Sequence, residues 1–200
     1  MMRHICLWTI RIRKEVNQMK FELQVSITEN DYFEFNTFHA LKSPYGQKNI
    51  KNSRIVLAVF GAIVVFLFLM ILGFTKRAIL FSIPLIALLA LMEIFWKQFI
   101  AFNLKIALKQ LKKRGKMAYS PFANIEFFEE YFVETTDEDK TERKYSSIER
   151  TSIVEGRYVY MHINNLAAII IPIGCFSSSK QYNEFIEFLR QKNEKIDFYK

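Results

Sequence analysis

Two long apolar runs dominate the hydrophobic pattern of the chain. Residues 55–75 carry no ionisable side chain, and residues 78–96 carry a single one, Glu93. An α-helix of about 20 residues spans the roughly 30 Å hydrocarbon core of a bilayer. A core helix of a soluble protein rarely stays apolar on every face for that length. The pattern therefore predicts a transmembrane hairpin at residues 55–96, with residues 75–77 as the link between its helices.

Glu93 is the acid of the second apolar run. It precedes Lys97 by four residues, the favourable order for an ion pair on a helix. Trp96 beside it is typical of a membrane interface. We therefore expect an ion pair of Glu93 with Lys97 at the membrane edge. A proton relay is the weaker alternative, because the run offers no second acid.

The polar and apolar residues before the hairpin change their period. Phe21, Leu23, Val25 and Ile27 alternate with polar residues, as in a half-buried strand. The sequence T-E-N-D from Thr28 then resembles a capping box and opens a short helix, which Ser43 and Pro44 end. The sequence thus predicts a strand and a short helix within residues 21–54. We interpret residues 1–20 as an extension, with Met19 as an alternative first residue.

Residues 97–116 form a basic amphipathic segment that we expect to continue the second membrane helix. Ile100, Leu104, Ala107, Leu108 and Leu111 lie on one helical face. The candidate lipid-headgroup contacts are Lys105, Lys109, Lys112, Lys113, Arg114 and Lys116. Such a segment is typical of a membrane-surface or partner-binding helix. A solvated spacer whose lysines only enforce the membrane topology remains an equal alternative.

Residues 117–200 predict a β-rich domain that ends in a helix. The apolar pattern indicates short strands on both sides of residues 129–130, then strands at residues 143–156 and 157–163. Asn164 and Asn165 favour a two-residue hairpin turn. The apolar run 166–176 reads as the returning, central strand, with Pro172 at its end.

The last helix follows three serines, any of which could cap it. Tyr182, Phe185, Ile186 and Leu189 recur at helical spacing and predict one buried face. The expected fold is therefore membrane α+β: a transmembrane hairpin with an antiparallel β domain closed by a C-terminal helix. This order is the one in which pleckstrin-homology-like modules are built.

The charges of the chain are unevenly distributed. The net charge is +8, yet residues 117–200 carry fourteen acidic and ten basic side chains. Residues 97–116 carry seven basic side chains and no acidic one. Anionic lipid is therefore the expected partner, and nucleic acid is not, because the β domain lacks a basic excess. Basic flanks outnumber the basic residues of the link, so both termini should lie in the cytoplasm.

The candidate chemical groups are dispersed. His4, His39 and His162 stand apart, and His162 fits a structural or surface position in a strand. Cys6 and Cys175 are too few for a disulfide framework, and Cys175 fits a small buried residue. The glycines form no phosphate-binding loop. We therefore predict no catalytic, cofactor-binding or metal-binding residues, and no enzyme.

The chain resembles the YcxB-like family of bacterial membrane proteins. The resemblance lies in the lead-in SITENDYFEFNTFH, the close-set hairpin, and the tail KYSSIERTSIVEGRYVYMHINNLAAIIIPIGCFSSSKQYNEFIEFL. It implies a two-helix anchor with a cytoplasmic β-rich domain, and it implies no activity. In that family a basic residue commonly follows the proline. Here Ile173, Gly174 and Cys175 stand in its place, and their role as a contact site is left open.

Two functions fit these observations. The first is a membrane-tethered, non-catalytic interaction module at the cytoplasmic face, with an unknown protein partner. The alternative is an accessory subunit of a transporter or membrane enzyme, assembled through the transmembrane hairpin.

Overall fold

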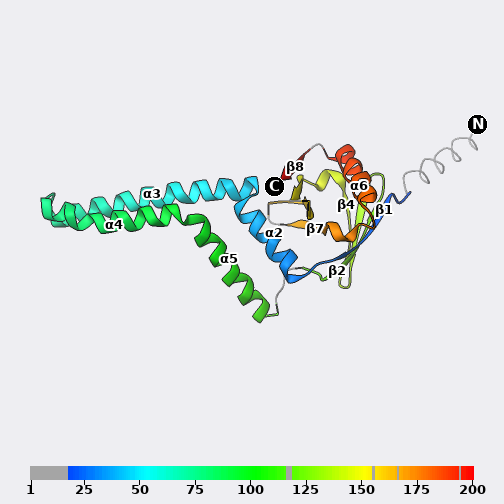
Figure 1. The fold of residues 1–200 in the computed structure, drawn as a ribbon, viewed down its shortest axis with the longest axis horizontal. Coiled ribbons are helices and arrows are strands. Elements are labelled where there is room, and N and C mark those ends of the chain that lie inside the picture. The colour runs from blue at the N-terminus through cyan, green and yellow to red at the C-terminus, as the bar shows by residue number, and fades with distance from the viewer. Residues whose placement is uncertain (1–17, 116–118, 155, 166, 194) are drawn as a thin grey trace, which may run out of the picture. The chain divides into compact units, whose positions relative to one another are not determined.

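The structure is a computed structural model that describes residues 18–115, 119–154, 156–165, 167–193 and 195–200. The described residues form two compact units (Figure 1). We call the residues up to 32 together with those from 119 onwards the β domain. Residues 33–115 belong to the second unit, which we call the helical unit.

The first sheet of the β domain joins strands from both sides of the helical unit. Its order is β1 (Phe21–Ser26), β2 (Phe122–Phe127), β3 (Tyr131–Thr136) and β4 (Lys140–Lys144), all antiparallel. The alternation predicted for β1 buries Leu23 and Val25. The sequence placed residues 21–54 apart from residues 117–200, whereas β1 pairs with β2 along its whole length. The helical unit is therefore an insertion between two neighbouring strands.

The second sheet has the order β7-β6-β5-β8. Its strands are β5 (Arg150–Val154), β6 (Tyr158–His162), β7 (Ala168–Pro172) and β8 (Ile196–Tyr199). β7 was predicted to be central and is instead an edge strand, a position that tolerates Pro172 because no further strand needs its missing N–H. Its three isoleucines are buried on both faces, as predicted. β8 was not predicted, and it pairs with β5 in parallel.

The connection between β6 and β7 is longer than the predicted two-residue turn. His162 pairs with Ala168, and the Ile163 N–H donates to the Ala167 carbonyl at 2.9 Å. The Asn164 side chain accepts a hydrogen bond from the Ala167 N–H at 2.8 Å. Asn164 thus closes the loop with its side chain and also with its N–H, which donates to the Ala167 carbonyl at 3.3 Å.

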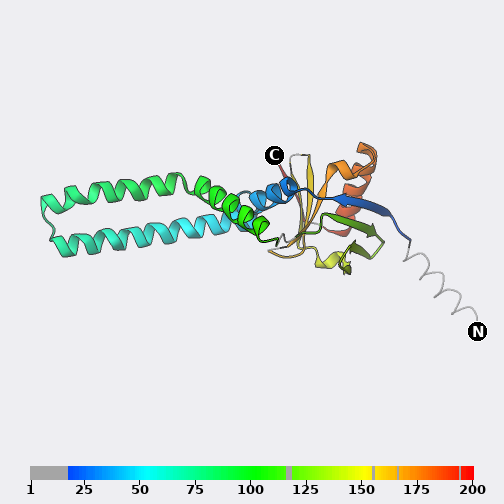
Figure 2. The ribbon, with the colours of Figure 1, turned by 90° about the horizontal axis from the view of Figure 1, so that it is seen from below.

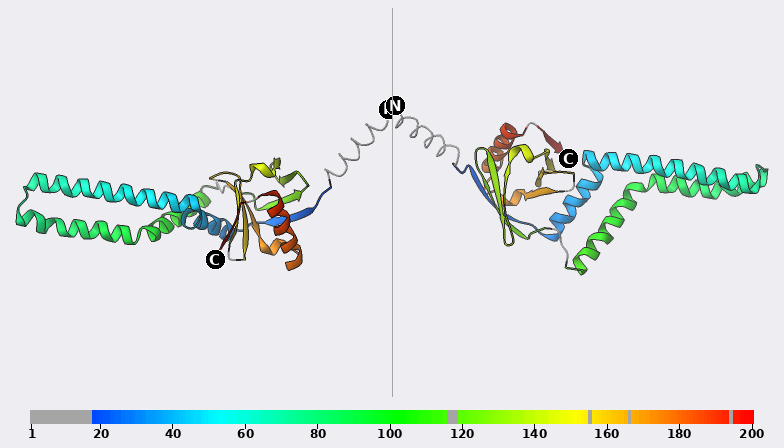
Figure 3. Two further views of the ribbon diagram at one scale, coloured as in Figure 1. Left: turned by 90° about the horizontal axis from the view of Figure 1, so that it is seen from above. Right: turned by 180° about the vertical axis from the view of Figure 1, so that it is seen from behind.

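The core of the β domain lies under helix α6 (Ser179–Lys192) (Figure 3). Ser178 caps this helix by accepting a hydrogen bond from the Gln181 N–H at 3.2 Å. Phe185, Ile186 and Leu189 enter the core, so the predicted buried face is confirmed. The Phe185 ring lies 4.9 Å from that of Phe127, centroid to centroid. The helix is followed by β8, so the domain does not end in a helix as expected.

The helical unit contains most of α2 (Glu29–Leu41) and all of α3 (Pro44–Leu72), α4 (Lys76–Ile94) and α5 (Trp96–Lys113). Ser43 caps α3 by accepting a hydrogen bond from the Gly46 N–H at 3.0 Å. A proline is favourable in the first helical turn, so Pro44 ends one helix and begins the next. α3 therefore starts well before residue 55, the predicted boundary.

The link between the two apolar helices is Gly73 to Thr75, not residues 75–77. Gly73 has a φ of 72°, a backbone conformation that glycine adopts without strain. Thr75 caps α4 by accepting a hydrogen bond from the Ala78 N–H at 3.2 Å. Lys76 and Arg77 thus belong to the first turn of α4.

α3 and α4 lie side by side as a hairpin (Figures 1 and 2). Small residues stand where the helices meet: Gly61 on α3, and Ala78 and Ser82 on α4, are buried. A Cβ atom on Gly61 would lie 2.9 Å from a methyl carbon of Leu89. Small residues allow this close approach, as in many membrane helix pairs.

Both helices of the hairpin are long and apolar enough to cross a membrane. Only 6% of the most apolar window of α3 and 11% of that of α4 is buried within the chain. Ile71, for example, is 83% exposed. These helices are therefore unlike the core helix of a soluble protein, whose apolar side chains pack against its own chain.

Candidate membrane-contact site

The open end of the hairpin carries an ion pair between its helices. The Arg54 Nε donates to Glu93 Oε2 at 2.7 Å. The predicted pair of Glu93 with Lys97 is therefore wrong in its partner. Lys97 lies one turn away on the next helix, whereas Arg54 reaches Glu93 because α3 and α4 are antiparallel neighbours. The pair is half-exposed, which limits its contribution to stability to about 1 kcal/mol or less.

The chain turns between α4 and α5 instead of continuing as the single helix that we predicted. Phe95 separates the two helices with φ −95° and ψ 13°. Phe95 is bonded to both helices: its N–H donates to the Leu91 carbonyl, and its carbonyl accepts from the Phe99 N–H. Figure 1 shows α5 leaving the axis of α4 at this point. α5 is therefore a separate helix whose axis differs from that of α4.

α5 has two apolar faces, and the sequence pattern identified one of them. The predicted stripe, represented by Ile100, Leu104 and Leu108, is half-buried. A second stripe is exposed on another face, and the sequence pattern did not identify it. Its members recur at helical spacing and are Phe95, Phe99, Phe102 and Ile106, with exposed fractions of 53%, 52%, 63% and 40%. An exposed apolar face of this kind is a candidate surface for contact with lipid.

The basic side chains of α5 flank the exposed stripe. Lys105 follows Phe102 by three residues and Lys109 follows Ile106 by three, so they lie on a neighbouring row of the helix. The described candidate headgroup contacts are all exposed: Lys105, Lys109, Lys112, Lys113 and Arg114. Lys116 lies outside the described residues. An apolar face bordered by lysines is the arrangement of an interfacial helix, because the long lysine side chains reach the headgroups.

Polar residues in the second sheet contact each other rather than an open site. Ser152 Oγ lies 3.1 Å from His162 Nε2, and both side chains are buried. Burial raises the pKa of the Tyr199 hydroxyl, with hydrogen bonds to Arg150 and Ser152 opposing that rise. His162 is therefore structural, and its partner was missed because it comes from the adjacent strand. The buried pair stabilises the pairing of β5 with β6.

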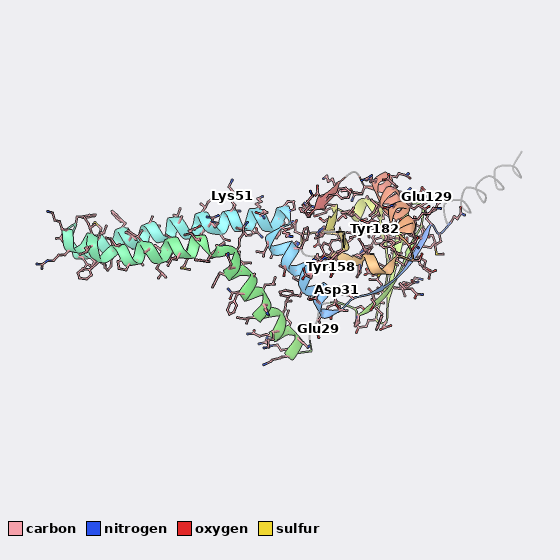
Figure 4. The ribbon with its side chains drawn as sticks, viewed as in Figure 1. Glu29, Asp31, Lys51, Glu129, Tyr158 and Tyr182 are labelled. Atoms are coloured by element: carbon pink, nitrogen blue, oxygen red, sulfur yellow. The ribbon has the colours of Figure 1, made fainter. Side chains whose placement is uncertain are left out.

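The start of α2 is held to the β domain by a carboxylate. Asp31 accepts hydrogen bonds from the Thr28 N–H at 2.8 Å and the Thr28 hydroxyl at 2.6 Å, and Thr28 Oγ1 accepts one from the Asp31 N–H. Asp31 also accepts one from the Tyr158 hydroxyl at 2.7 Å (Figure 4). Burial raises the pKa of Asp31, but these hydrogen bonds outweigh it and leave the pKa below its usual value. The predicted capping box is present with Asp31 as its acid.

Cys175 ends a short 3-10 turn, Ile173–Cys175, after β7. It is half-buried and packs against the core of the β domain. Burial raises the pKa of the thiol, a backbone hydrogen bond from Ser26 opposes the rise, and the charge of Asp31 adds to it. The thiol therefore stays protonated near neutral pH, which makes it a weak nucleophile.

The β domain also has a shallow hollow beside β8, with a volume of about 670 Å³. Its lining residues are Glu149, Arg150, Lys195, Ile196 and Asp197. Acidic and basic side chains are mixed there, so the charge favours neither an anion nor a cation. Within the described ranges, no group of three or more His, Cys, Asp or Glu side chains could hold a metal ion.

Comparison with known proteins supports one part of the chain. The family model described as YcxB-like protein matches residues 127–189. The match extends from the end of β2 through most of α6, and it leaves out β1 and the hairpin, which the lead-in resemblance had included. Searches of curated proteins and of solved structures found no match. The chain therefore carries a YcxB-like domain in its C-terminal part.

Proposed function

We propose that this chain is a two-span membrane protein whose β domain is a non-catalytic interaction module at the cytoplasmic face. The pairing of β1 with β2 carries the proposal. Because both ends of the hairpin lead into neighbouring strands of one sheet, both ends must open on the same side of a bilayer. A pair of spans satisfies this requirement. The domain is thus tethered by two covalent connections.

The orientation is supported by the basic residues around the hairpin. Lys48, Lys51 and Arg54 lie on the first turns of α3, and the basic residues of α5 follow α4. Lys76 and Arg77 at the closed end are fewer. Basic residues favour the cytoplasmic side during insertion. The open end of the hairpin, with the β domain, is therefore assigned to the cytoplasm.

The order of strands and helix supports a pleckstrin-homology-like module. Four antiparallel strands form the first sheet, β5 to β7 form an antiparallel meander in the second, and α6 completes the core. The hairpin interrupts this order between β1 and β2, and β8 is added beside β5. The potentially reactive side chains serve the fold: Ser152 and His162 bond to each other, and Ser178 caps α6. This use supports binding rather than catalysis.

The lipid-facing role of α5 rests on its exposed aromatic stripe and its lysines. Anionic lipid attracts each basic residue near the surface by about 1 kcal/mol. The interfacial helix would hold the β domain close to the membrane, where a membrane-bound protein partner is within reach.

The deciding experiment replaces residues 55–96 with a short flexible linker. The variant should leave the membrane fraction, remain folded because the sheet pairing is intact, and capture the partner that cross-links to the full chain in native membranes. A folded, soluble variant that no longer captures that partner would instead favour the alternative, an accessory subunit assembled through the hairpin.

A further inference from the structure

The open end of the hairpin contains a hollow of about 430 Å³ within the helical unit. One face of α3 and the junction of α4 with α5 line it. The lining residues are Gln47, Ile50, Lys51, Arg54, Ile55, Ala58, Glu93 and Lys97. The volume falls within the range of small-molecule sites. Ala58 is small, which leaves room between the helices beside the apolar Ile55.

The charge of this hollow favours an anion. Lys51, Arg54 and Lys97 contribute three positive charges against the one negative charge of Glu93. Arg54 is engaged through Nε with Glu93, and its other guanidinium N–H groups can still donate. Lys51 and Lys97 are exposed, and neither has an ion-pair partner among the described residues (Figure 4 labels Lys51). Two cations are therefore available to a ligand.

The hollow combines polar and apolar lining. Lys51, Arg54, Glu93 and Lys97 supply the charged part, Ile50 is a buried apolar neighbour of Lys51, and Ile55 and Ala58 lie further along α3 toward its apolar length. An amphipathic anion with a phosphate and a hydrocarbon chain matches both parts of this lining. The second oxygen of Glu93, Oε1, is buried without a hydrogen-bond partner in the described part of the chain. A headgroup hydroxyl could donate to it, since a carboxylate oxygen accepts but cannot donate.

We infer that this hollow binds one anionic phospholipid with a hydroxyl-bearing headgroup, of which phosphatidylglycerol is the simplest. The phosphate lies between Lys51 and Lys97, the headgroup hydroxyl donates to Glu93, and an acyl chain follows Ile55 along α3. The site is separate from the lysines further along α5, from Lys105 onwards, and it rests on the proposed insertion of the hairpin in a bilayer. Basic pockets between membrane helices bind anionic headgroups in this way.

Trp96 makes the inference measurable. It follows Glu93 by three residues, and the sequence has one other tryptophan, Trp8. The full chain carrying Trp8→Phe is reconstituted in vesicles of phosphatidylcholine with added phosphatidylglycerol. Two preparations are compared: in one the phosphatidylcholine is brominated in its acyl chain, and in the other the phosphatidylglycerol is. Quenching of Trp96 then reports which lipid lies beside it. The expected result is a preference for phosphatidylglycerol that saturates at a low mole fraction.

The lysines are tested with a charge-matched control. The double variant Lys51→Gln with Lys97→Gln should lower the preference for phosphatidylglycerol over phosphatidylcholine. The expected loss is about fivefold for each lysine removed, because anionic lipid attracts one basic residue near the surface by about 1 kcal/mol. The control Lys76→Gln with Arg77→Gln removes the same charge from the closed end of the hairpin and should change the preference less than about twofold, because the attraction falls off within a Debye length. An unchanged preference in the first variant, or an equal loss in both, overturns the inference.

Two further outcomes separate the sources of failure. Glycerol 3-phosphate in the buffer should not relieve the quenching, and relief would mean that the site takes a free phosphate rather than a lipid. Brominated phosphatidylcholine alone should quench Trp96 in every variant. Absence of that quenching would show that Trp96 is not at a bilayer, which contradicts the proposed function and, with it, the lipid site.

Discussion

Helices α5 and α6 are both amphipathic, yet they place their apolar side chains in opposite environments. α6 buries Phe185 completely in the core of the β domain, whereas Phe102 on α5 is 63% exposed. No residue of α5 is buried. The period of a helix therefore identifies which side chains share a face, but it does not identify what covers that face. For α6 the cover is two sheets of its own domain, and for α5 we assign it to lipid.

The same contrast separates the two units as wholes. In the β domain, isoleucine and phenylalanine side chains fill a continuous core between the sheets and α6. In the hairpin, the residues at the helix contact are small, and the large apolar residues point outward. Burial against its own chain stabilises the first unit in water. In the second unit, small contact residues allow the helices to approach closely, and the proposed bilayer would supply the apolar solvent for the side chains outside.

The largest expected effect comes from truncating the core of α6. Phe185→Ala should lower the free energy of unfolding of the β domain by about 3–5 kcal/mol, because it removes a fully buried ring and leaves a cavity. Hydrogen exchange of the β6 amides in the full chain measures this loss. The matched control is Phe102→Ala on α5, which should leave β6 exchange unchanged. Equal losses in both variants would end the distinction between the two helices.

The basic face of α5 should give the next largest effect. A peptide of residues 97–116 should bind vesicles of anionic lipid but not of neutral lipid. Replacing Lys105, Lys109 and Lys113 with Gln should weaken that binding by about 3 kcal/mol. Raising the salt concentration should weaken the unmodified peptide as well, since screening acts on exposed charges. Equal binding to both vesicle types would reject the electrostatic contribution.

The close contact inside the hairpin predicts a smaller effect. Gly61→Leu should destabilise the packing of α3 on α4 by about 1–3 kcal/mol, because the new side chain overlaps Leu89. Energy transfer between labels on the two helices, followed during denaturation in detergent, measures the change. Val59→Leu is the control, because Val59 is 56% exposed and its enlargement meets no neighbouring helix. A control that destabilises as strongly as Gly61→Leu would contradict the assigned contact.

The smallest expected effect is the loss of the Asp31 helix cap at the start of α2 when the pH is lowered. Because the pKa of Asp31 is below its usual value, its contribution is present above the unfolded pKa of about 3.9 and is lost as the pH falls through the folded pKa. We expect the start of α2 to lose about 1 kcal/mol of stability, the typical contribution of a helix cap. The hydrogen-exchange rates of the amides in the first turn of α2, measured as a function of pH, report this loss.

Asp31→Asn is the control for this titration. The variant should start α2 less stably at neutral pH, and it should lose the dependence on pH in the acidic window. A variant that keeps the same pH dependence would show that another group is responsible.

Local periodicity was enough to predict several elements. The alternation from Phe21 to Ile27 predicted β1, and the capping box at Thr28 predicted the start of α2. The stripe containing Phe185 and Leu189 predicted the buried face of α6. Each of these depends on residues a few positions apart, where the geometry of one helix or strand decides the contacts.

Contacts between distant residues were beyond this reasoning. Arg54 as the partner of Glu93 follows from the antiparallel packing of α3 and α4. The contact of Ser152 with His162 and the parallel pairing of β8 follow from sheet register. For Glu93 a nearer partner was expected, and for His162 and β8 no partner was predicted, because a single sequence shows spacing along the chain and not which strands or helices become neighbours.

The sequence by itself determined that this protein has two apolar helices long enough for a membrane, a basic segment after them, and a β-rich, YcxB-like end. The apolar helices, the basic segment and the β-rich pattern reside in composition and short periods, which act before any tertiary contact forms, whereas the YcxB-like character came from a resemblance to a family. Only the tertiary structure decided that β1 pairs with β2 across the whole helical insertion, that α5 turns at Phe95, and that Lys51, Arg54 and Lys97 surround one hollow. The physical reason is that strand order and helix packing follow from burial and register across the assembled chain, and adjacent residues do not encode them.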